Sequence, residues 1–199
     1  MHIDRGNPLP GLVTHADGPA CVRYVPGWLA DDDRWMAALV DAVAWEQPTV
    51  TVFGRQHPTP RLTAWYGDAA YSYSGITHAP AAFPAPLSEI RERLLTTTGV
   101  RFNSCLANLY RDGSDSMGAH ADNEPELGPE PTIASVSLGA RRRFVMTHVE
   151  SGERFTWSLG SGDLLVMSGE SQREYRHAVP KTTAATRTRL NLTFRVFAT

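Results

Sequence analysis

The chain has 199 residues, a length that suits one globular domain with a substantial buried core. Hydrophobic residues make up 42% of the chain and charged residues 20%, a balance that excludes an intrinsically disordered protein. The formal net charge of −2 excludes a uniformly basic protein, so a polyanion would have to bind at a local group of arginines.

The N-terminal half is predicted to contain two helices separated by hairpin strands. Residues 1–20 are rich in glycine and proline and are predicted to be irregular. A helix is expected over 30–43, where an acidic start precedes apolar residues at helical spacing. The β-branched and aromatic segment 50–75 predicts hairpin strands, and a second helix is expected over 86–97.

The C-terminal half is predicted to consist of short strands separated by turns, such as those at Asp112-Gly113 and Ser161-Gly162. The predicted strands are 104–110, 133–138, 143–148, 154–158, 163–167 and 189–197. Two helices followed by many strands predict an α+β, mainly β fold, a double-stranded β-helix (jelly roll) buttressed by N-terminal helices. We expect one domain over residues 1–199, with the jelly-roll core at 101–199.

The cellular setting follows from what the sequence lacks. Two cysteines, Cys21 and Cys105, do not make a disulfide framework, and both are expected to be reduced. The first residues lack the layout of a signal peptide, and no apolar run is long enough to cross a membrane. We therefore expect a soluble cytoplasmic protein.

A metal site is predicted from His120-Ala-Asp122 and a distant His177. On a β-strand, residues two apart point to the same face, so His120 and Asp122 could hold one ion together. Two imidazoles and one carboxylate form the facial triad that binds Fe(II) in oxygenases and leaves positions open for catalysis. A structural zinc site would instead favour four ligands, usually including thiolates.

The C-terminal segment alternates polar and apolar residues, with Arg189, Asn191, Thr193 and Arg195 on one side. Such alternation usually marks a half-exposed strand whose polar side faces solvent. The other reading is a polar stripe inside the barrel, whose two arginines could pair with the two ends of 2-oxoglutarate. The alternation alone does not decide, but beside the predicted triad it favours the second reading.

These segments together resemble the AlkB-type Fe(II)/2-oxoglutarate-dependent dioxygenases, a family of nucleic-acid dealkylating enzymes. The matching segments are Asn108-Leu-Tyr110, His120-Ala-Asp122, His177 and Arg189-Leu-Asn191-Leu-Thr193-Phe-Arg195. With the intervening segments they cover most of residues 50–197. The resemblance implies that Asn108, Tyr110, Arg189, Asn191 and Arg195 bind 2-oxoglutarate. Arg189 is expected at the distal carboxylate and Arg195 near the end that chelates iron.

Segments of the N-terminal half resemble the lid of the subgroup that repairs double-stranded DNA. They are Pro60-Arg61, Tyr66-Gly67-Asp68 and Tyr71-Ser-Tyr73-Ser-Gly75, and they imply a nucleotide-recognition lid within residues 1–100. By this resemblance Arg61, Tyr71 and Tyr73 contact the damaged base. The chain is two residues shorter here than the subgroup's pattern, so either ring could stack, and ordinary hairpin tyrosines stay an alternative.

Three further positions are candidates for nucleic-acid contacts. Phe53 beside Gly54 resembles a finger hairpin whose apolar residue fills the place of an extruded base, although it could equally cover the N-terminal helices. Glu124 occupies the place of an acid that reads the base edge, or belongs to a solvated acidic loop. The run from Arg141 to Arg143 could contact phosphates, or be a plain surface feature.

The function implied by the resemblance is direct-reversal repair of DNA. Fe(II), 2-oxoglutarate and dioxygen would oxidise the N-methyl group of 1-methyladenine or 3-methylcytosine, releasing formaldehyde and the unmodified base. The partner would be DNA, with RNA as an alternative, and the protein is expected to be a monomer. Two other functions stay open: an oxygenase acting on RNA, protein or a small molecule, and a non-catalytic metal-binding jelly roll.

Overall fold

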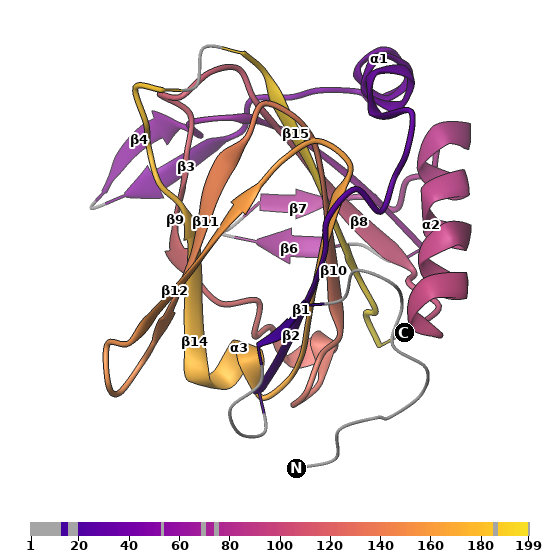
Figure 1. Cartoon of the computed structure of the whole chain (residues 1–199). Helices are drawn as coiled ribbons and strands as arrows, with labels where there is room; N and C mark the ends of the chain where they lie inside the picture. Colours follow the sequence, from indigo (N-terminus) through magenta and orange to yellow (C-terminus); the bar gives the residue numbers. More distant parts are fainter. Residues whose placement is uncertain are drawn as a thin grey trace.

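The computed structural model describes residues 13–15, 20–52, 54–68, 71–73, 76–184 and 187–198. Within this part of the chain, two antiparallel sheets face each other (Figure 1). The larger sheet has the strand order β1 (Val13–His15), β2 (Ala20–Val25), β13 (Asp163–Gly169), β10 (Ile133–Gly139), β15 (Arg189–Arg195), β8 (Ser104–Tyr110) and β5 (Leu62–Gly67). The smaller sheet has the order β12 (Arg154–Leu159), β11 (Arg142–His148), β14 (Tyr175–Val179) and β9 (Met117–His120).

Two small hairpins and four helical segments complete the described architecture. The hairpins are β3 (Thr49–Val52) with β4 (Arg55–Pro58), and β6 (Tyr71–Tyr73) with β7 (Ile76–His78). The helical segments are α1 (Asp32–Ala42), α2 (Ala85–Thr98), the short α3 (Ser171–Glu174) and the 3-10 helix η1 (Pro125–Leu127). This arrangement confirms the predicted mainly β jelly-roll class with N-terminal helices.

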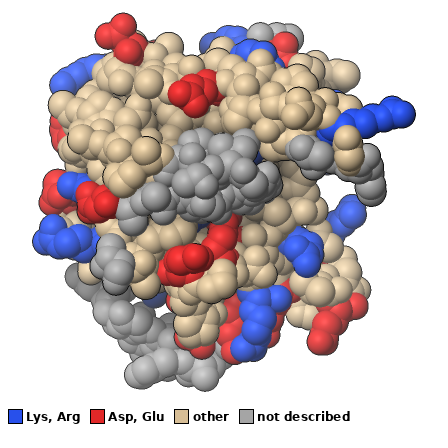
Figure 2. Space-filling view, turned by 180° about the vertical axis from the view of Figure 1, so that it is seen from behind, with Lys and Arg blue, Asp and Glu red and all other residues tan. Residues whose placement is uncertain are grey.

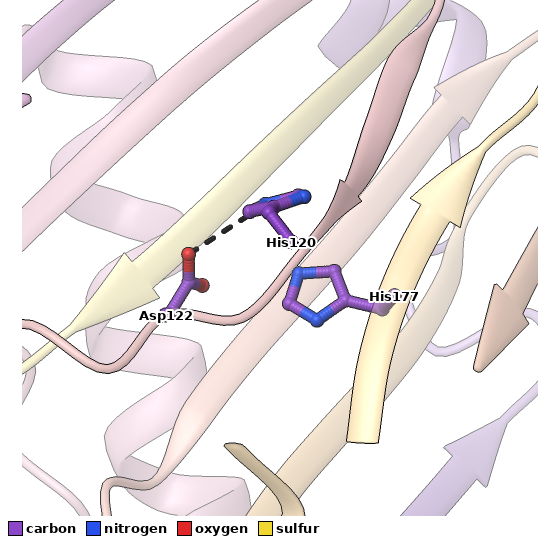
Figure 3. Close-up of side chains that lie close together, drawn as sticks. All are labelled: His120, Asp122 and His177. Carbon is purple, nitrogen blue, oxygen red and sulfur yellow. Dashed lines mark ion pairs between the residues drawn. The ribbon is translucent and has the colours of Figure 1, made fainter. Parts of the chain in front are cut away.

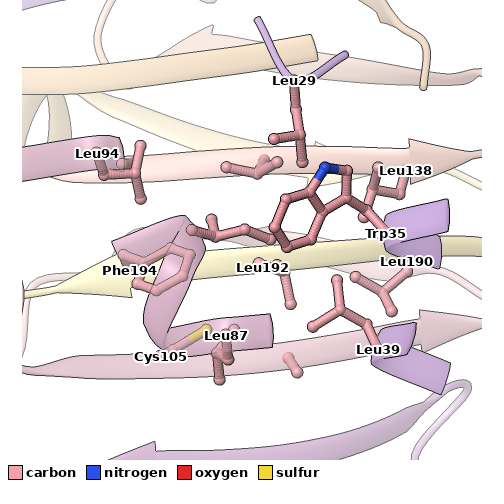
Figure 4. Close-up of a cluster of buried hydrophobic side chains, with 14 of the residues drawn as sticks. Leu29, Trp35, Leu39, Leu87, Leu94, Cys105, Leu138, Leu190, Leu192 and Phe194 are labelled. Atoms are coloured by element: carbon pink, nitrogen blue, oxygen red, sulfur yellow. The ribbon is translucent and has the colours of Figure 1, made fainter. Parts of the chain in front are cut away.

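Helices α1 and α2 cover the outer face of the larger sheet (Figure 1). Trp35 and Leu39 of α1 and Leu87, Ile90 and Leu94 of α2 are buried in one apolar cluster, part of which Figure 4 shows. The sheet contributes the alternating apolar residues of its central strands to the same cluster, including Leu190, Leu192 and Phe194 of β15. Burial of these helix faces, rather than helix propensity, holds the layer in place.

The opposite face of β15 points between the two sheets, which places the polar half of its alternating pattern inside the molecule. Arg189, Asn191, Thr193 and Arg195 are all buried, so this strand is not half-exposed. A second apolar cluster fills the rest of that interior. Its members include Val22, Tyr110, Ile133, Phe144, Met146, Leu165 and Met167. The polar stripe therefore lies inside the barrel, as the second reading of the alternation required.

The main differences from the predictions concern five strands. Residues 13–15 were predicted to be irregular but form β1, which pairs with β2, a strand that was not predicted. The short strands β9 and β14 were also missed, and β15 ends at Arg195 rather than at residue 197. Because β1, β2 and β5 join the larger sheet, both halves of the chain build it. Among the described residues no helix has the length and apolar character to span a membrane.

Candidate active site

The three predicted metal ligands converge at one end of the smaller sheet (Figure 3). His120 ends β9 and lies opposite His177 of β14 in the antiparallel ladder, and Asp122 follows two residues after β9. One ligand atom from each of the three residues lies within 4.8 Å of the others. His120 Nε2 is 3.7 Å from Asp122 Oδ1. This is an open three-ligand set of the kind that binds a catalytic metal.

Both imidazoles are oriented by their neighbours. His120 Nδ1 lies 2.9 Å from the carbonyl oxygen of Gly118, and because a carbonyl can only accept, Nδ1 carries a proton, which leaves Nε2 as the nitrogen that could bind a metal. Burial, helped by the nearby His120, lowers the pKa of His177 to about 3, so this ring is neutral. The His177 ring stacks on Phe144 at 5.4 Å between ring centroids, which fixes its plane.

Asp122 is held in its charged form by Arg195 of β15. Asp122 Oδ2 accepts hydrogen bonds from Arg195 Nε at 3.0 Å and Nη2 at 2.8 Å, and both residues are buried. Burial raises the pKa of the Asp122 carboxyl, but the charge and hydrogen bonds of Arg195 lead the effects that oppose it, and the pKa lies below its usual value. Arg195, expected from the sequence to bind 2-oxoglutarate, is thus paired with the metal-site carboxylate.

Arg189 at the other end of β15 is a buried cation with unused donors. Its Nη2 donates to Ser137 Oγ at 2.9 Å, whereas Nε and Nη1 are buried without a hydrogen-bond partner among the described residues. The Arg189 Cζ atom lies 5.2 Å from the centroid of the Tyr110 ring. Burial lowers the pKa of Arg189. A buried guanidinium with two unpaired donors fits an incoming carboxylate.

The two candidate amides are oriented by neighbouring side chains. Asn191 Nδ2 donates to Ser135 Oγ at 2.8 Å, and its Oδ1 accepts from Thr193 Oγ1 at 3.1 Å. Asn108 Oδ1 accepts from Arg61 Nε at 2.8 Å, and Arg61 is buried. Arg61, expected from the sequence to contact the damaged base, therefore lies against the Asn108 amide within the barrel.

A small cavity, partly open to solvent, joins the metal ligands to the polar stripe. Its lining includes His120, Asp122, His177, Asn108, Tyr110, Asn191 and Arg195, with apolar walls from Met117, Phe144 and Met167. Arg189 is not part of this lining, but its guanidinium packs over the ring of Tyr110, which is. One carboxylate and two imidazoles at one end of the polar stripe, with the buried Arg189 guanidinium at the other, fit a divalent metal with a dicarboxylate beside it.

For the remaining residues that were predicted to bind the substrate, the structure describes only part of their positions. Tyr71 and Tyr73 lie on β6, which pairs with β7, but their side chains fall outside the described part of the structure. Phe53 also falls outside the described residues. Glu124 is partly buried and directly precedes η1, two residues after Asp122.

Three residues of the site were not predicted. Ser135 and Ser137 of β10 hydrogen-bond Asn191 and Arg189, and their two-residue spacing between apolar neighbours could have placed them on the inward face. Gln172 of α3 accepts a hydrogen bond from the backbone N–H of Asp122. No local pattern signals this contact, because the two residues lie far apart in the sequence.

Comparisons with known proteins agree with this geometry. A family model described as the 2OG-Fe(II) oxygenase superfamily matches residues 21–195. The rat alpha-ketoglutarate-dependent dioxygenase alkB homolog 3 is 40% identical over 190 residues, covering 89% of this chain and 64% of that protein. The mouse DNA oxidative demethylase ALKBH2 is 40% identical over 193 residues, covering 90% of this chain and 81% of that protein.

The chain thus spans about two thirds of the length of the alkB homolog 3 proteins that it matches. The solved structure of OsALKBH1 superposes with a TM-score of 0.67, at 19% identity, over 92% of this chain and 100% of that one, which supports the shared fold. The family match covers most of the chain and includes every ligand of the predicted metal site. The chain therefore belongs to the AlkB-type Fe(II)/2-oxoglutarate-dependent dioxygenases.

Proposed function

We propose that this protein removes methyl groups from N-alkylated bases in DNA, with 1-methyladenine and 3-methylcytosine as substrates. The observation that carries the proposal is the convergence of His120, Asp122 and His177 beside a barrel interior that contains the Arg189 guanidinium, whose Nε and Nη1 have no hydrogen-bond partner among the described residues. Family membership identifies the metal as Fe(II) and the co-substrate as 2-oxoglutarate. The mouse relative named as a DNA oxidative demethylase supports DNA as the substrate.

Bound iron, with 2-oxoglutarate and dioxygen, supplies the oxidation of the N-methyl group, which leaves as formaldehyde. The protein's own part is to hold and orient. His120 Nε2, one ring nitrogen of His177 and the Asp122 carboxylate would hold the metal, with the Gly118 carbonyl and Arg195 fixing two of these groups. Three protein ligands would leave further coordination positions of the metal free for the co-substrates.

The co-substrate would be bound by the polar stripe inside the barrel. Arg189 would pair with the distal carboxylate, since its Nε and Nη1 are buried and have no hydrogen-bond partner among the described residues. Asn108 and Tyr110 would donate along the length of the molecule. Asn191, whose two amide hydrogens already donate to Ser135 Oγ and the Val136 carbonyl oxygen, would line the same path. Arg195 would act mainly through Asp122, to which it already donates two hydrogen bonds.

The damaged base would enter between the lid and the metal ligands. An N1-methylated adenine or N3-methylated cytosine is cationic, so stacking on Tyr71 or Tyr73 would gain a cation–π contribution. Glu124, two residues after Asp122, would accept from an exocyclic amino group. Phe53 would fill the gap that the extruded base leaves in the duplex. Arg61 would support this pocket from behind Asn108.

Contacts with the DNA backbone would be local rather than spread over the surface. On the face shown in Figure 2, acidic and basic side chains are interspersed. Arg141 and Arg143 are exposed and would meet phosphates, Arg141 with the donors that its hydrogen bond to the Ser158 carbonyl oxygen leaves over. Arg142 is buried and donates to the carbonyl oxygens of Asp112, Asp115 and Pro180. We expect the protein to act as a monomer in the cytoplasm.

The direct test is mass spectrometry of methylated oligonucleotides incubated with Fe(II), 2-oxoglutarate and the protein. We expect the loss of one methyl group from 1-methyladenine and 3-methylcytosine in DNA. Asp122→Asn should abolish turnover by weakening metal binding while keeping an acceptor for Arg195. We prefer Asn to Ala here because Ala would leave Arg195 buried without its carboxylate.

The same assay separates the alternatives. Demethylation of RNA but not of DNA would reassign the substrate. Conversion of 2-oxoglutarate to succinate without any change in nucleic acid would favour a protein or small-molecule substrate. Metal binding without any succinate formation would indicate a non-catalytic metal-binding jelly roll. Full activity of Asp122→Asn with iron bound would remove the proposed metal site.

A further inference from the structure

The backbone of Asp122 lies outside the sheet that carries the histidines. The β9–β14 ladder reaches the pair His120 and His177, and Asp122 follows two residues later. A buried backbone N–H that leaves a ladder needs another acceptor, because an unmade hydrogen bond in the interior is unfavourable. The direction of the Asp122 side chain therefore depends on what holds this piece of backbone.

Gln172 provides that acceptor. Its Oε1 lies 3.0 Å from the backbone nitrogen of Asp122, and the side chain is buried. Gln172 Nε2 is 3.5 Å from Met167 Sδ and 3.2 Å from Ser171 Oγ, both of which can accept. Since the Asp122 N–H can only donate, the amide must present its oxygen to Asp122, and these contacts define its orientation.

Gln172 also belongs to the segment that carries the third ligand. It lies in α3, which packs against β13, β2 and β14 and leads directly into β14. His177 is on that strand. One side chain therefore connects the backbone of the Asp122 ligand to the segment preceding the His177 ligand. Arg195 holds the Asp122 carboxylate from the other sheet, so the two contacts act on different parts of the same residue.

We propose that Gln172 is a positioning residue of the metal centre, which sets the place of Asp122 relative to His177. This inference deepens the proposed function and rests on its metal site. Contacts that orient metal ligands typically change metal affinity by about 10–100-fold when they are removed. Loss of the Gln172 acceptor should therefore weaken the metal site without disturbing the sheets.

The test compares the apo wild-type protein with Gln172→Met, which keeps the side chain's length but removes the acceptor. Two quantities are measured: amide hydrogen exchange of the segment around Asp122, and affinity for Co(II) followed by its visible absorption. We expect faster exchange confined to this segment and a Co(II) dissociation constant about 10–100-fold higher. Gln172→Asn, which is too short to reach, should behave in the same way and replaces Gln172→Met if that variant fails to fold.

Two controls make the result specific. Gln172→Glu retains an acceptor oxygen and should restore both the slow exchange and most of the Co(II) affinity. Gln47→Met removes a side-chain hydrogen bond to Thr59 O, remote from the metal ligands, and should change neither quantity.

The inference is overturned if Gln172→Met keeps wild-type exchange at Asp122 and Co(II) affinity within twofold. It is equally overturned if exchange accelerates throughout the molecule, since Gln172 would then be a general packing residue. Failure of the wild-type protein itself to bind Co(II) would instead count against the proposed function. The exchange measurement on the apo protein would still decide whether Gln172 holds the Asp122 backbone.

Discussion

Arg189 is the residue whose environment says most about the chemistry of the site, because its positive charge is buried without an anion beside it in the described part of the chain. A fully buried cation is unfavourable unless an anion or several acceptors surround it. Arg189 has a relative exposure of 1%, and two of its donor nitrogens have no partner among the described residues. The folded protein thus carries a cost at this position that a carboxylate would offset.

Replacing Arg189 with Met should therefore weaken the binding of 2-oxoglutarate without lowering the stability of the apo protein. We expect the apo protein to keep its melting temperature or gain slightly, because a buried unpaired charge is removed. The KM for 2-oxoglutarate should rise about 100-fold or more, since two charge-assisted hydrogen bonds are lost. Calorimetry and the rate of succinate formation measure the two effects.

The matched control for this prediction is Arg101→Met, which changes an exposed arginine remote from the barrel interior and should leave both quantities unchanged. A clear drop in the melting temperature of apo Arg189→Met would mean that Arg189 is a structural cation. An unchanged KM would mean that the distal carboxylate binds elsewhere.

At the scale of elements, strands with a clear two-residue alternation were predictable and the short connecting strands were not. The bounds of β8 were predicted from its sequence, and β15 was misplaced only at its end. Strand β9, with the sequence Met-Gly-Ala-His, has no β-branched residue, and α3 has four residues, too few for helical periodicity. Both flank ligands of the metal site, so the ligands were identified from the sequence whereas their supports were not.

The contacts made by the polar side chains of β15 were likewise only partly predictable from the sequence. The sequence indicated which residues would share a face of β15, because alternation depends only on neighbours along the strand. It could not show that Arg195 donates to Asp122, since that pairing depends on how the two sheets stack. The contact between Arg61 and Asn108 depends likewise on the register of β5 against β8.

One turn links the elements of the helix layer to the larger sheet. Gly162 has a φ of +80°, accepts from Leu29 N at 2.9 Å and donates to Ser137 O at 2.8 Å. A Cβ at this position would lie 2.5 Å from Leu29 O, so a side chain meets both backbone strain and a steric clash.

Gly162→Ala should consequently lower the free energy of unfolding by about 1–3 kcal/mol. Gly99→Ala is the matched control, because Gly99 has a similar φ of +72° at the end of α2 but open space around its Cβ position. We expect Gly99→Ala to lower the free energy of unfolding by about 1 kcal/mol. Urea denaturation of both variants measures the difference, and equal losses would show that the contact with Leu29 relaxes freely.

For the molecule as a whole, the interior between the sheets carries more positive than negative charge around the candidate site. Arg195 and Asp122 both line the described cavity and offset each other, whereas Arg189 is buried on the same face of β15 and Arg61 is buried against Asn108, neither in an ion pair with a carboxylate of the described residues. A divalent metal adds positive charge to this interior, and a dicarboxylate reduces it. Their binding should therefore be mutually favourable, and such coupling is reciprocal by thermodynamic necessity.

Thermal unfolding in the presence of each ligand checks this coupling. We use Mn(II) in place of Fe(II) to avoid oxidation during the scan. A ligand at one hundred times its dissociation constant stabilises a protein by about 2.7 kcal/mol, which for this chain length raises the melting temperature by roughly 5–10 °C. Mn(II) with 2-oxoglutarate should raise it by more than the sum of the separate shifts.

The variants assign each shift to a residue. Arg189→Met should lose the rise in melting temperature caused by 2-oxoglutarate and keep the rise caused by Mn(II), whereas Asp122→Asn should lose the rise caused by Mn(II). Strictly additive shifts in the wild-type protein would mean that the metal and the dicarboxylate bind to this interior independently of each other.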